Sequence, residues 1–154
     1  MHNKSLMKNS IPVIVLILLF FSFLPLSGGS QGSRTFEISS VTIKFDKTDA
    51  EFIVNYDLGT IPKVYILLMG GRSIEPKIRE LFSNFDYEII KMDQDKTILH
   101  VKNISRYDKN VNYYLHESVK FGGTLNTIIV YIPGDEHPVE YSSRNATPTK
   151  FYRQ

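Results

Sequence analysis

The first 30 residues divide this chain into a leader and a body, and only the body can form a compact domain. Lys4 and Lys8 precede sixteen uncharged, mostly apolar residues, 11–26, and the small residues 27–30 follow them. This order is typical of an export signal. Any hydrophobic core must therefore come from residues 31–154.

The leader has two possible fates. Sixteen helical residues cover roughly 24 Å, less than the ~30 Å hydrocarbon core of a bilayer, which favours a signal peptide cleaved between Gly29 and Ser30. Alternatively, Gly28 to Ser30 extend a tilted helix, and residues 11–26 are a retained membrane anchor. In both cases the positive-inside rule predicts an extracytoplasmic body, secreted after cleavage or anchored by residues 11–26.

Composition narrows what the body can be. Its length suits one domain, which needs an ordinary packed core because the chain has no cysteine to form a disulfide. The net charge of +2 belongs to the leader, since removing Lys4 and Lys8 leaves 16 basic residues against 16 acidic ones. These charges are interspersed, so we expect no nucleic-acid partner.

Short runs of alternating apolar and polar residues predict strands through most of the body. Residues 36–45 and 50–56 form a predicted hairpin, in which the apolar phase slips at Ser39-Ser40 and indicates a bulge. The other predicted strands are 87–92 and 97–101, which form a second hairpin, and then 111–116 and 125–132.

One strand and one helix interrupt this alternation. Residues 64–69 are continuously apolar and predict a strand covered on both faces near the middle of the sheet. A helix follows, with Ser73 as its predicted N-cap and Pro76 in its first turn. Its apolar stripe, expected to lie on the sheet, consists of Ile74, Ile78, Leu81, Phe82 and Phe85.

The order of these elements predicts an α+β fold, a mainly antiparallel sheet of about six or seven strands with one helix packed on it. A β-sandwich with an inserted helix is the alternative. The expected organisation is a signal peptide or membrane anchor at 1–29, a linker at 30–35, a single extracytoplasmic domain at 36–140, and a polar tail or edge strand at 141–154.

Gly70, Gly71, Arg72 and Ser73 form a candidate anion site. They lead from the apolar strand into the helix, where backbone amides can hold an anion with help from the arginine. The spacing matches neither a phosphate loop nor a dinucleotide site, so a plain tight turn is the preferred interpretation.

A second candidate site, for a metal, consists of Asp135, Glu136, His137 and Glu140. Carboxylates beside an imidazole can ligate a metal ion, but the flanking Pro-Gly and Pro favour a solvated turn. The sequence has no Gly-x-Ser-x-Gly elbow, no His-Glu-x-x-His run and no cysteine, so we expect neither a catalytic residue nor a cofactor.

Two glycosylation acceptor patterns occur, at Asn103 with Ser105 and at Asn145 with Thr147. Export would make both usable. Asn103 is accessible only if the strand at 97–101 ends before it, because in a continuing strand it would share the face of Leu99.

Aromatic residues are frequent, and several lie towards the C-terminus. Tyr113 and Tyr114 should point to opposite faces of a strand, and Tyr141, Phe151 and Tyr152 follow later. Exposed tyrosines suit contact with a protein or a sugar, but strands also select aromatic residues for packing. Core filling is the expected role.

The segment from Glu75 to Phe82 and the Tyr113-Tyr114-Leu115-His116 strand resemble small exported or membrane-anchored archaeal proteins of unassigned function. This resemblance implies no activity and nominates no site residue. The sequence therefore favours a non-catalytic cell-surface binding module, which contacts an envelope protein or surface polymer and touches the membrane if its leader is uncleaved. The alternative is a small extracytoplasmic enzyme or a metal- or anion-binding protein that uses Arg72 or His137 with Glu136.

Overall fold

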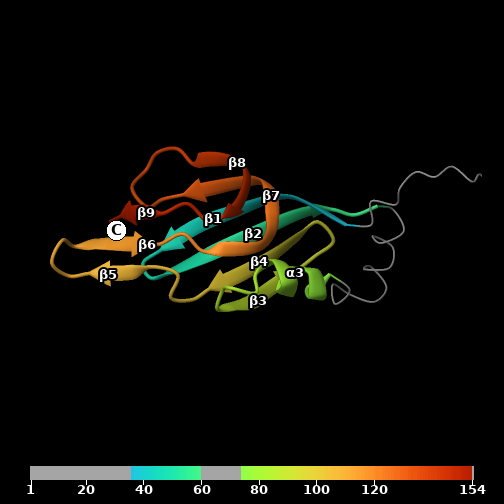
Figure 1. Cartoon of the computed structure of the whole chain (residues 1–154), viewed down its shortest axis with the longest axis horizontal. Coiled ribbons are helices and arrows are strands. Elements are labelled where there is room, and N and C mark those ends of the chain that lie inside the picture. The colour runs from blue at the N-terminus through green and yellow to red at the C-terminus, as the bar shows by residue number, and fades with distance from the viewer. Residues whose placement is uncertain (1–35, 60–73, 154) are drawn as a thin grey trace, which may run out of the picture. The chain divides into compact units, whose positions relative to one another are not determined.

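The computed structural model describes residues 36–59 and 74–153, which belong to the compact unit Arg34–Gln154 (Figure 1). Strands account for 59% of the described residues and the only helix among them is short, so this part of the chain is mainly β. None of its helices is long and apolar enough to cross a bilayer. The predicted strand at 64–69 and the Ser73 cap lie outside the described residues.

Two sheets contain the described strands. Sheet A has six strands in the order β3-β4-β2-β1-β7-β8, and sheet B has three in the order β5-β6-β9. The strand bounds are β1 Glu37–Asp46, β2 Asp49–Asp57, β3 Tyr87–Met92, β4 Lys96–Val101, β5 Arg106–Asp108, β6 Tyr113–His116, β7 Lys120–Tyr131, β8 Val139–Ala146 and β9 Lys150–Tyr152.

Sheet A is mixed, so the expectation of a mainly antiparallel sheet is only partly confirmed. Its neighbouring strands pair antiparallel except β1 and β7, which are parallel, with Val41 opposite Ile128. After β4 the chain leaves this sheet to form β5 and β6, and it returns as β7 beside β1. Such a return through other elements lets two strands run in the same direction.

The first predicted hairpin is confirmed, including its bulge. β1 and β2 pair antiparallel, and their register shifts between Ile38 and Ser40. Beyond this shift, alternate residues of both strands point into the core, where Ile43 and Phe52 are fully buried opposite each other. The bulge thus restores one buried face, as the change of phase in the sequence indicated.

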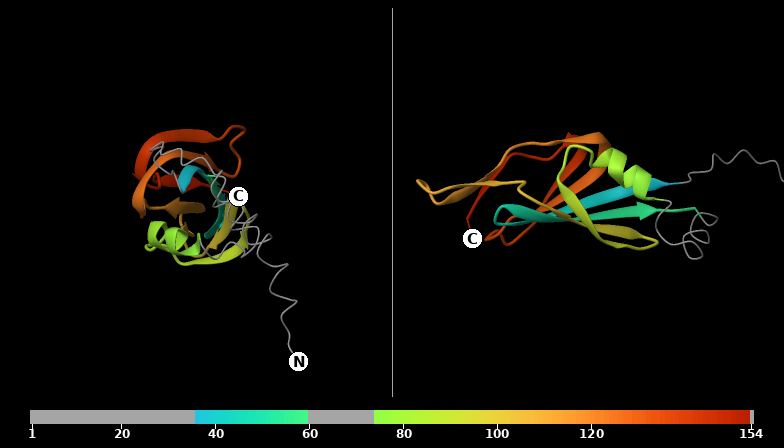
Figure 2. Two further views of the ribbon diagram at one scale, coloured as in Figure 1. Left: turned by 90° about the vertical axis from the view of Figure 1, so that its right-hand side faces the viewer. Right: turned by 90° about the horizontal axis from the view of Figure 1, so that it is seen from below.

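The helix α3 spans Glu75–Leu81 and packs its predicted stripe into the core. Its N-cap is Ile74, with no side-chain capping hydrogen bond. Just after the helix, Phe82 is fully buried and meets Phe52 and Phe121 edge to face, at centroid distances of 5.8 and 5.7 Å. Figure 2 shows α3 beside the orange strand β7, whose Gly122 allows the close approach.

The C-terminal residues, predicted as a polar tail or edge strand, form the edge strand β8 of sheet A and the edge strand β9 of sheet B. On the inner face of sheet B, the Tyr114 ring stacks on Tyr152 at 5.6 Å and meets Tyr107 at 4.9 Å. Tyr152 in turn packs 5.2 Å from Phe45 of β1. Aromatic contacts therefore join sheet B to one end of β1 in sheet A.

Candidate functional site

A buried polar cluster surrounds His116, the last residue of β6. His116 is fully buried, with Nδ1 2.8 Å from the Ile104 carbonyl oxygen and Nε2 2.7 Å from Thr147 Oγ1. Thr147 Oγ1 also accepts a hydrogen bond from the Val119 amide at 2.9 Å. The cluster consequently joins three segments that lie far apart in the sequence.

The partners of His116 define its neutral tautomer. A carbonyl oxygen can only accept, so Nδ1 carries the hydrogen and Nε2 accepts from the Thr147 hydroxyl. Burial lowers the pKa of His116 because the imidazolium would lose its hydration, and this outweighs the Ile104 carbonyl and Glu117, which act in the opposite direction. The folded unit thus favours the uncharged ring.

Tyr152, on β9, forms buried hydrogen bonds next to the His116 cluster. Its hydroxyl donates to the Lys47 carbonyl oxygen at 2.7 Å and lies 2.7 Å from Ser105 Oγ. Burial raises the pKa of Tyr152 to about 12, because the phenolate would be desolvated. The side chain therefore stays protonated and pins β9 to the turn between β1 and β2.

This cluster is structural. A hydroxyl bonded to an imidazole whose other nitrogen is oriented by an oxygen has the connectivity of an activated nucleophile. Here, however, His116 has no exposed surface and Thr147 is 1% exposed, so a substrate has no access to either. What the arrangement does is orient β6, the start of β7 and the segment after β8.

The outer face of sheet B carries a group of side chains that we call the sheet B patch, formed by the half-buried Tyr113 and Leu115 and the exposed Phe151 and Arg153. Leu115 and Phe151 are direct partners across β6 and β9, and Phe151 is 66% exposed. The Arg153 guanidinium lies over the Tyr113 ring, 4.1 Å from its centroid. The prediction that Tyr113 and Tyr114 face opposite ways is confirmed, because Tyr114 packs on the inner face.

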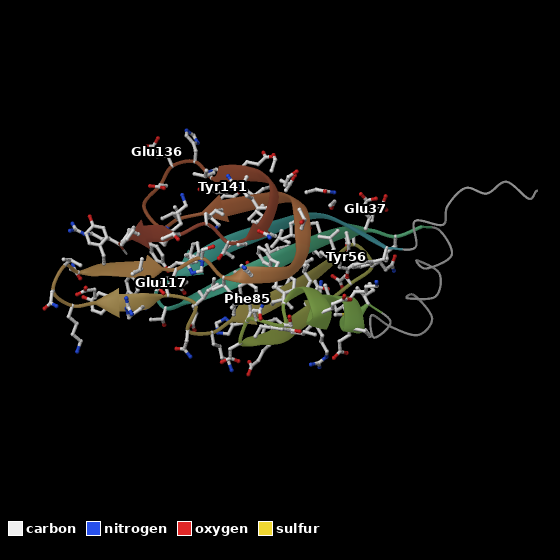
Figure 3. The ribbon with its side chains drawn as sticks, viewed as in Figure 1. Glu37, Tyr56, Phe85, Glu117, Glu136 and Tyr141 are labelled. Atoms are coloured by element: carbon white, nitrogen blue, oxygen red, sulfur yellow. The ribbon has the colours of Figure 1, made fainter. Side chains whose placement is uncertain are left out.

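The predicted metal residues lie in and after the turn between β7 and β8. Gly134 has φ +87° and the Asp135 amide donates to the Ile132 carbonyl, which is the geometry of a type II turn. All four candidates, Asp135, Glu136, His137 and Glu140, are exposed. Glu136 projects outward in Figure 3, and no three His, Asp or Glu side chains of the described segments lie close enough to hold a metal ion.

Two other predicted sites fall outside the described residues. These are the candidate anion site, Gly70 to Ser73, and the cleavage site at Gly29 and Ser30. The acceptor asparagines, in contrast, are both described. β4 ends at Val101, so Asn103 lies beyond the strand and is exposed, and Asn145 is exposed on β8.

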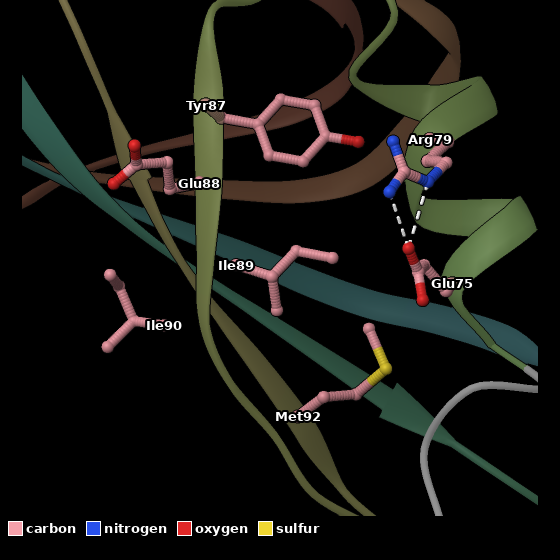
Figure 4. A pocket seen from close by; sticks show the side chains of 7 residues that line it. All are labelled: Glu75, Arg79, Tyr87, Glu88, Ile89, Ile90 and Met92. Carbon is pink, nitrogen blue, oxygen red and sulfur yellow. Dashed lines mark hydrogen bonds and ion pairs between the residues drawn. The ribbon is translucent and has the colours of Figure 1, made fainter.

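A hollow of about 650 Å³ opens between α3 and β3 (Figure 4). Tyr87, Ile89 and Met92 line it from the strand, and Glu75 and Arg79 from the helix. These two charged groups form an ion pair, as do Glu88 and Lys102 nearby. The charged side chains that line the hollow among the described residues are therefore already paired and would not select a charged ligand.

No family model, no curated protein sequence and no solved structure matches this chain. Sequence reasoning missed the His116 cluster, although the alternation along β6 places His116 on the inner face with Tyr114. The signal was an imidazole on the apolar phase of a strand.

Proposed function

We propose that this chain is an exported, non-catalytic module that binds another protein of the cell envelope through the sheet B patch. The body is either secreted or held at the membrane by residues 11–26. The observation that carries the proposal is the exposure of Phe151 beside Leu115 on an ordered sheet face. We also infer the α+β class, because α3 packs on the core face of sheet A.

The composition of the patch supports a protein partner. Aromatic residues and arginine are among the side chains enriched at the centres of protein interfaces, where their large side chains bury much area. Tyr113, Phe151 and Arg153 belong to these types, and the arginine is already positioned over the tyrosine ring. The patch is therefore largely ordered before binding, which lowers the entropic cost of association.

The position of the patch also supports this proposal. β9 is an edge strand of sheet B, and an edge strand can pair with an extended segment of a partner, here beside the exposed Phe151 ring. The inner face of the same sheet is fixed by Tyr152 and the His116 cluster. A rigid support of this kind keeps the outer side chains in one arrangement.

A photo-crosslinking amino acid placed at residue 151 of the full chain, in intact cells, tests the proposal. Residue 90 is the matched control, because Ile90 is 62% exposed against 66% for Phe151 but lies on β3 of sheet A. We expect one discrete protein adduct from position 151 and none from position 90. Equal adducts from both positions, no adduct from 151, or a polymer adduct would contradict the proposal.

A further inference from the structure

The two acceptor asparagines share a feature that their sequence patterns do not reveal. Asn103 and Asn145 are exposed, but the hydroxyl residue of each pattern is buried, with Ser105 6% and Thr147 1% exposed. Both patterns also contact His116, one through the Ile104 carbonyl and the other through Thr147 Oγ1. The buried cluster around His116 therefore contacts both acceptor patterns.

Hydrogen bonds fix the backbone and the hydroxyl group of each pattern. The Ser105 amide donates to the Thr48 carbonyl at 2.9 Å, and Ser105 Oγ lies 2.7 Å from the Tyr152 hydroxyl. The Thr147 amide donates to the Val119 carbonyl at 2.9 Å, while Thr147 Oγ1 is bonded to His116. Neither hydroxyl can be presented to an enzyme while these bonds persist.

We propose that Asn103 and Asn145 are N-glycan acceptors that can be glycosylated only before this unit folds. In the transfer, the asparagine Nδ2 forms a bond to C1 of a sugar carried by a lipid-linked phosphate donor. The bond between C1 and the phosphate oxygen breaks, the lipid phosphate leaves with the electron pair, and the amide loses one proton. The acceptor pattern requires the Ser or Thr hydroxyl, which only the unfolded chain exposes.

This inference rests on the export step of the proposed function, because the transfer takes place outside the cytoplasm. It does not depend on the sheet B patch. After folding, the attached sugars would project from the surface, since both asparagine side chains are exposed.

An oligosaccharyltransferase with a lipid-linked oligosaccharide tests the proposal on the folded full chain. The control is Asn112→Ser, which creates an acceptor pattern at Asn110 in the turn between β5 and β6, where residues 110–112 are all exposed. Asn112 has φ +55° and accepts a hydrogen bond from the Tyr107 hydroxyl, so the fold of the variant is checked first by thermal unfolding against the unsubstituted chain. Synthetic peptides spanning residues 99–109, 106–116 with the same substitution, and 141–151 represent the unfolded acceptors. Mass spectrometry then reports the occupancy of each asparagine.

In the folded variant, we expect Asn103 and Asn145 to be modified at least about tenfold more slowly than Asn110, because each first requires local opening. In the peptides, all three should be modified, and each rate in the folded variant is divided by the rate of its own peptide, because Asn103 and Asn110 have Ser patterns whereas Asn145 has a Thr pattern followed by Pro148. Equal rates in the folded variant, or peptides modified at Asn110 alone, would overturn the inference. Crosslinking at residue 151 measures binding separately, so the two proposals can fail independently.

Discussion

Sheet A is held to α3 by phenylalanine rings, whereas sheet B is held to the rest of the unit by side chains that also carry polar atoms. In the first region, Phe82 contacts Phe52, Phe85 and Phe121. In the second, His116 and Tyr152 pack on Phe45 of β1 and form hydrogen bonds to backbone and hydroxyl oxygens. Both regions are well buried, but different forces hold them.

The two regions should therefore respond differently to substitutions and to pH. Apolar contacts have little directionality, so the packing around Phe82 should depend on volume and be insensitive to pH. In the cluster around His116, each buried polar atom depends on a particular partner, and loss of one partner leaves the other desolvated. No buried side-chain nitrogen or oxygen of the described residues lacks a hydrogen bond.

The largest effect is expected from Phe82→Ala. The substitution removes a fully buried ring that meets four other aromatic rings, and it should lower the free energy of unfolding by about 3–5 kcal/mol. Urea denaturation measures the change. Ile90→Ala, at an exposed site, should change stability by less than about 0.5 kcal/mol. Equal losses in both variants would show that the rings do not form the principal core.

Gly122→Ala tests how closely α3 approaches sheet A. A Cβ at position 122 would lie 2.2 Å from the Glu80 carbonyl oxygen, so the helix must shift, at a cost of about 2–3 kcal/mol. Gly123→Ala is the matched control, because its Cβ would lie 3.8 Å from Leu81 Cδ1, an ordinary van der Waals contact. Thermal unfolding of the two variants distinguishes them. Identical melting temperatures would contradict the helix position.

His116→Leu probes the polar region with a side chain of similar size. The Ile104 carbonyl would lose the imidazole N–H, and the Thr147 hydroxyl would keep only its bonds to Val119, which should cost about 1–2 kcal/mol. His100→Leu serves as the control, since the His100 side chain is 41% exposed and lies 3.3 Å from Asp49 on the surface of β4. Urea denaturation near neutral pH measures both variants. A smaller loss for His116→Leu than for His100→Leu would exclude the cluster as a stabilising element.

The sequence predicts the region around Phe82 better than the region around His116, and contact range explains the difference. Hairpins, the bulge at Ser39-Ser40 and the helical stripe are local patterns that repeat over neighbouring residues. Sheet B is built from strands of three or four residues, too short for a clear alternation, and His116 meets Thr147 across 31 positions. The parallel pairing of β1 with β7 is likewise non-local.

Acid should destabilise the region around His116 more than the region around Phe82. Because the pKa of folded His116 lies below the unfolded value near 6.5, its contribution to stability is complete above that pH and is lost as the pH falls towards the folded pKa. Protonated Nε2 would donate to Thr147, whose hydroxyl then has only the Val119 carbonyl, at 3.4 Å, as its acceptor. The Glu117 carboxylate, which raises the pKa of the ring, only partly opposes this loss because burial outweighs it.

Amide hydrogen exchange at about pH 7.5 and about pH 5, corrected for intrinsic rates, tests the difference between the two regions most directly. We expect protection in β6 and β9 to fall at the lower pH while β1, β2 and β4 keep theirs. In His116→Leu, the pH dependence in sheet B should disappear. Loss of protection in all strands together, or a sheet B that is insensitive to pH, would contradict the account.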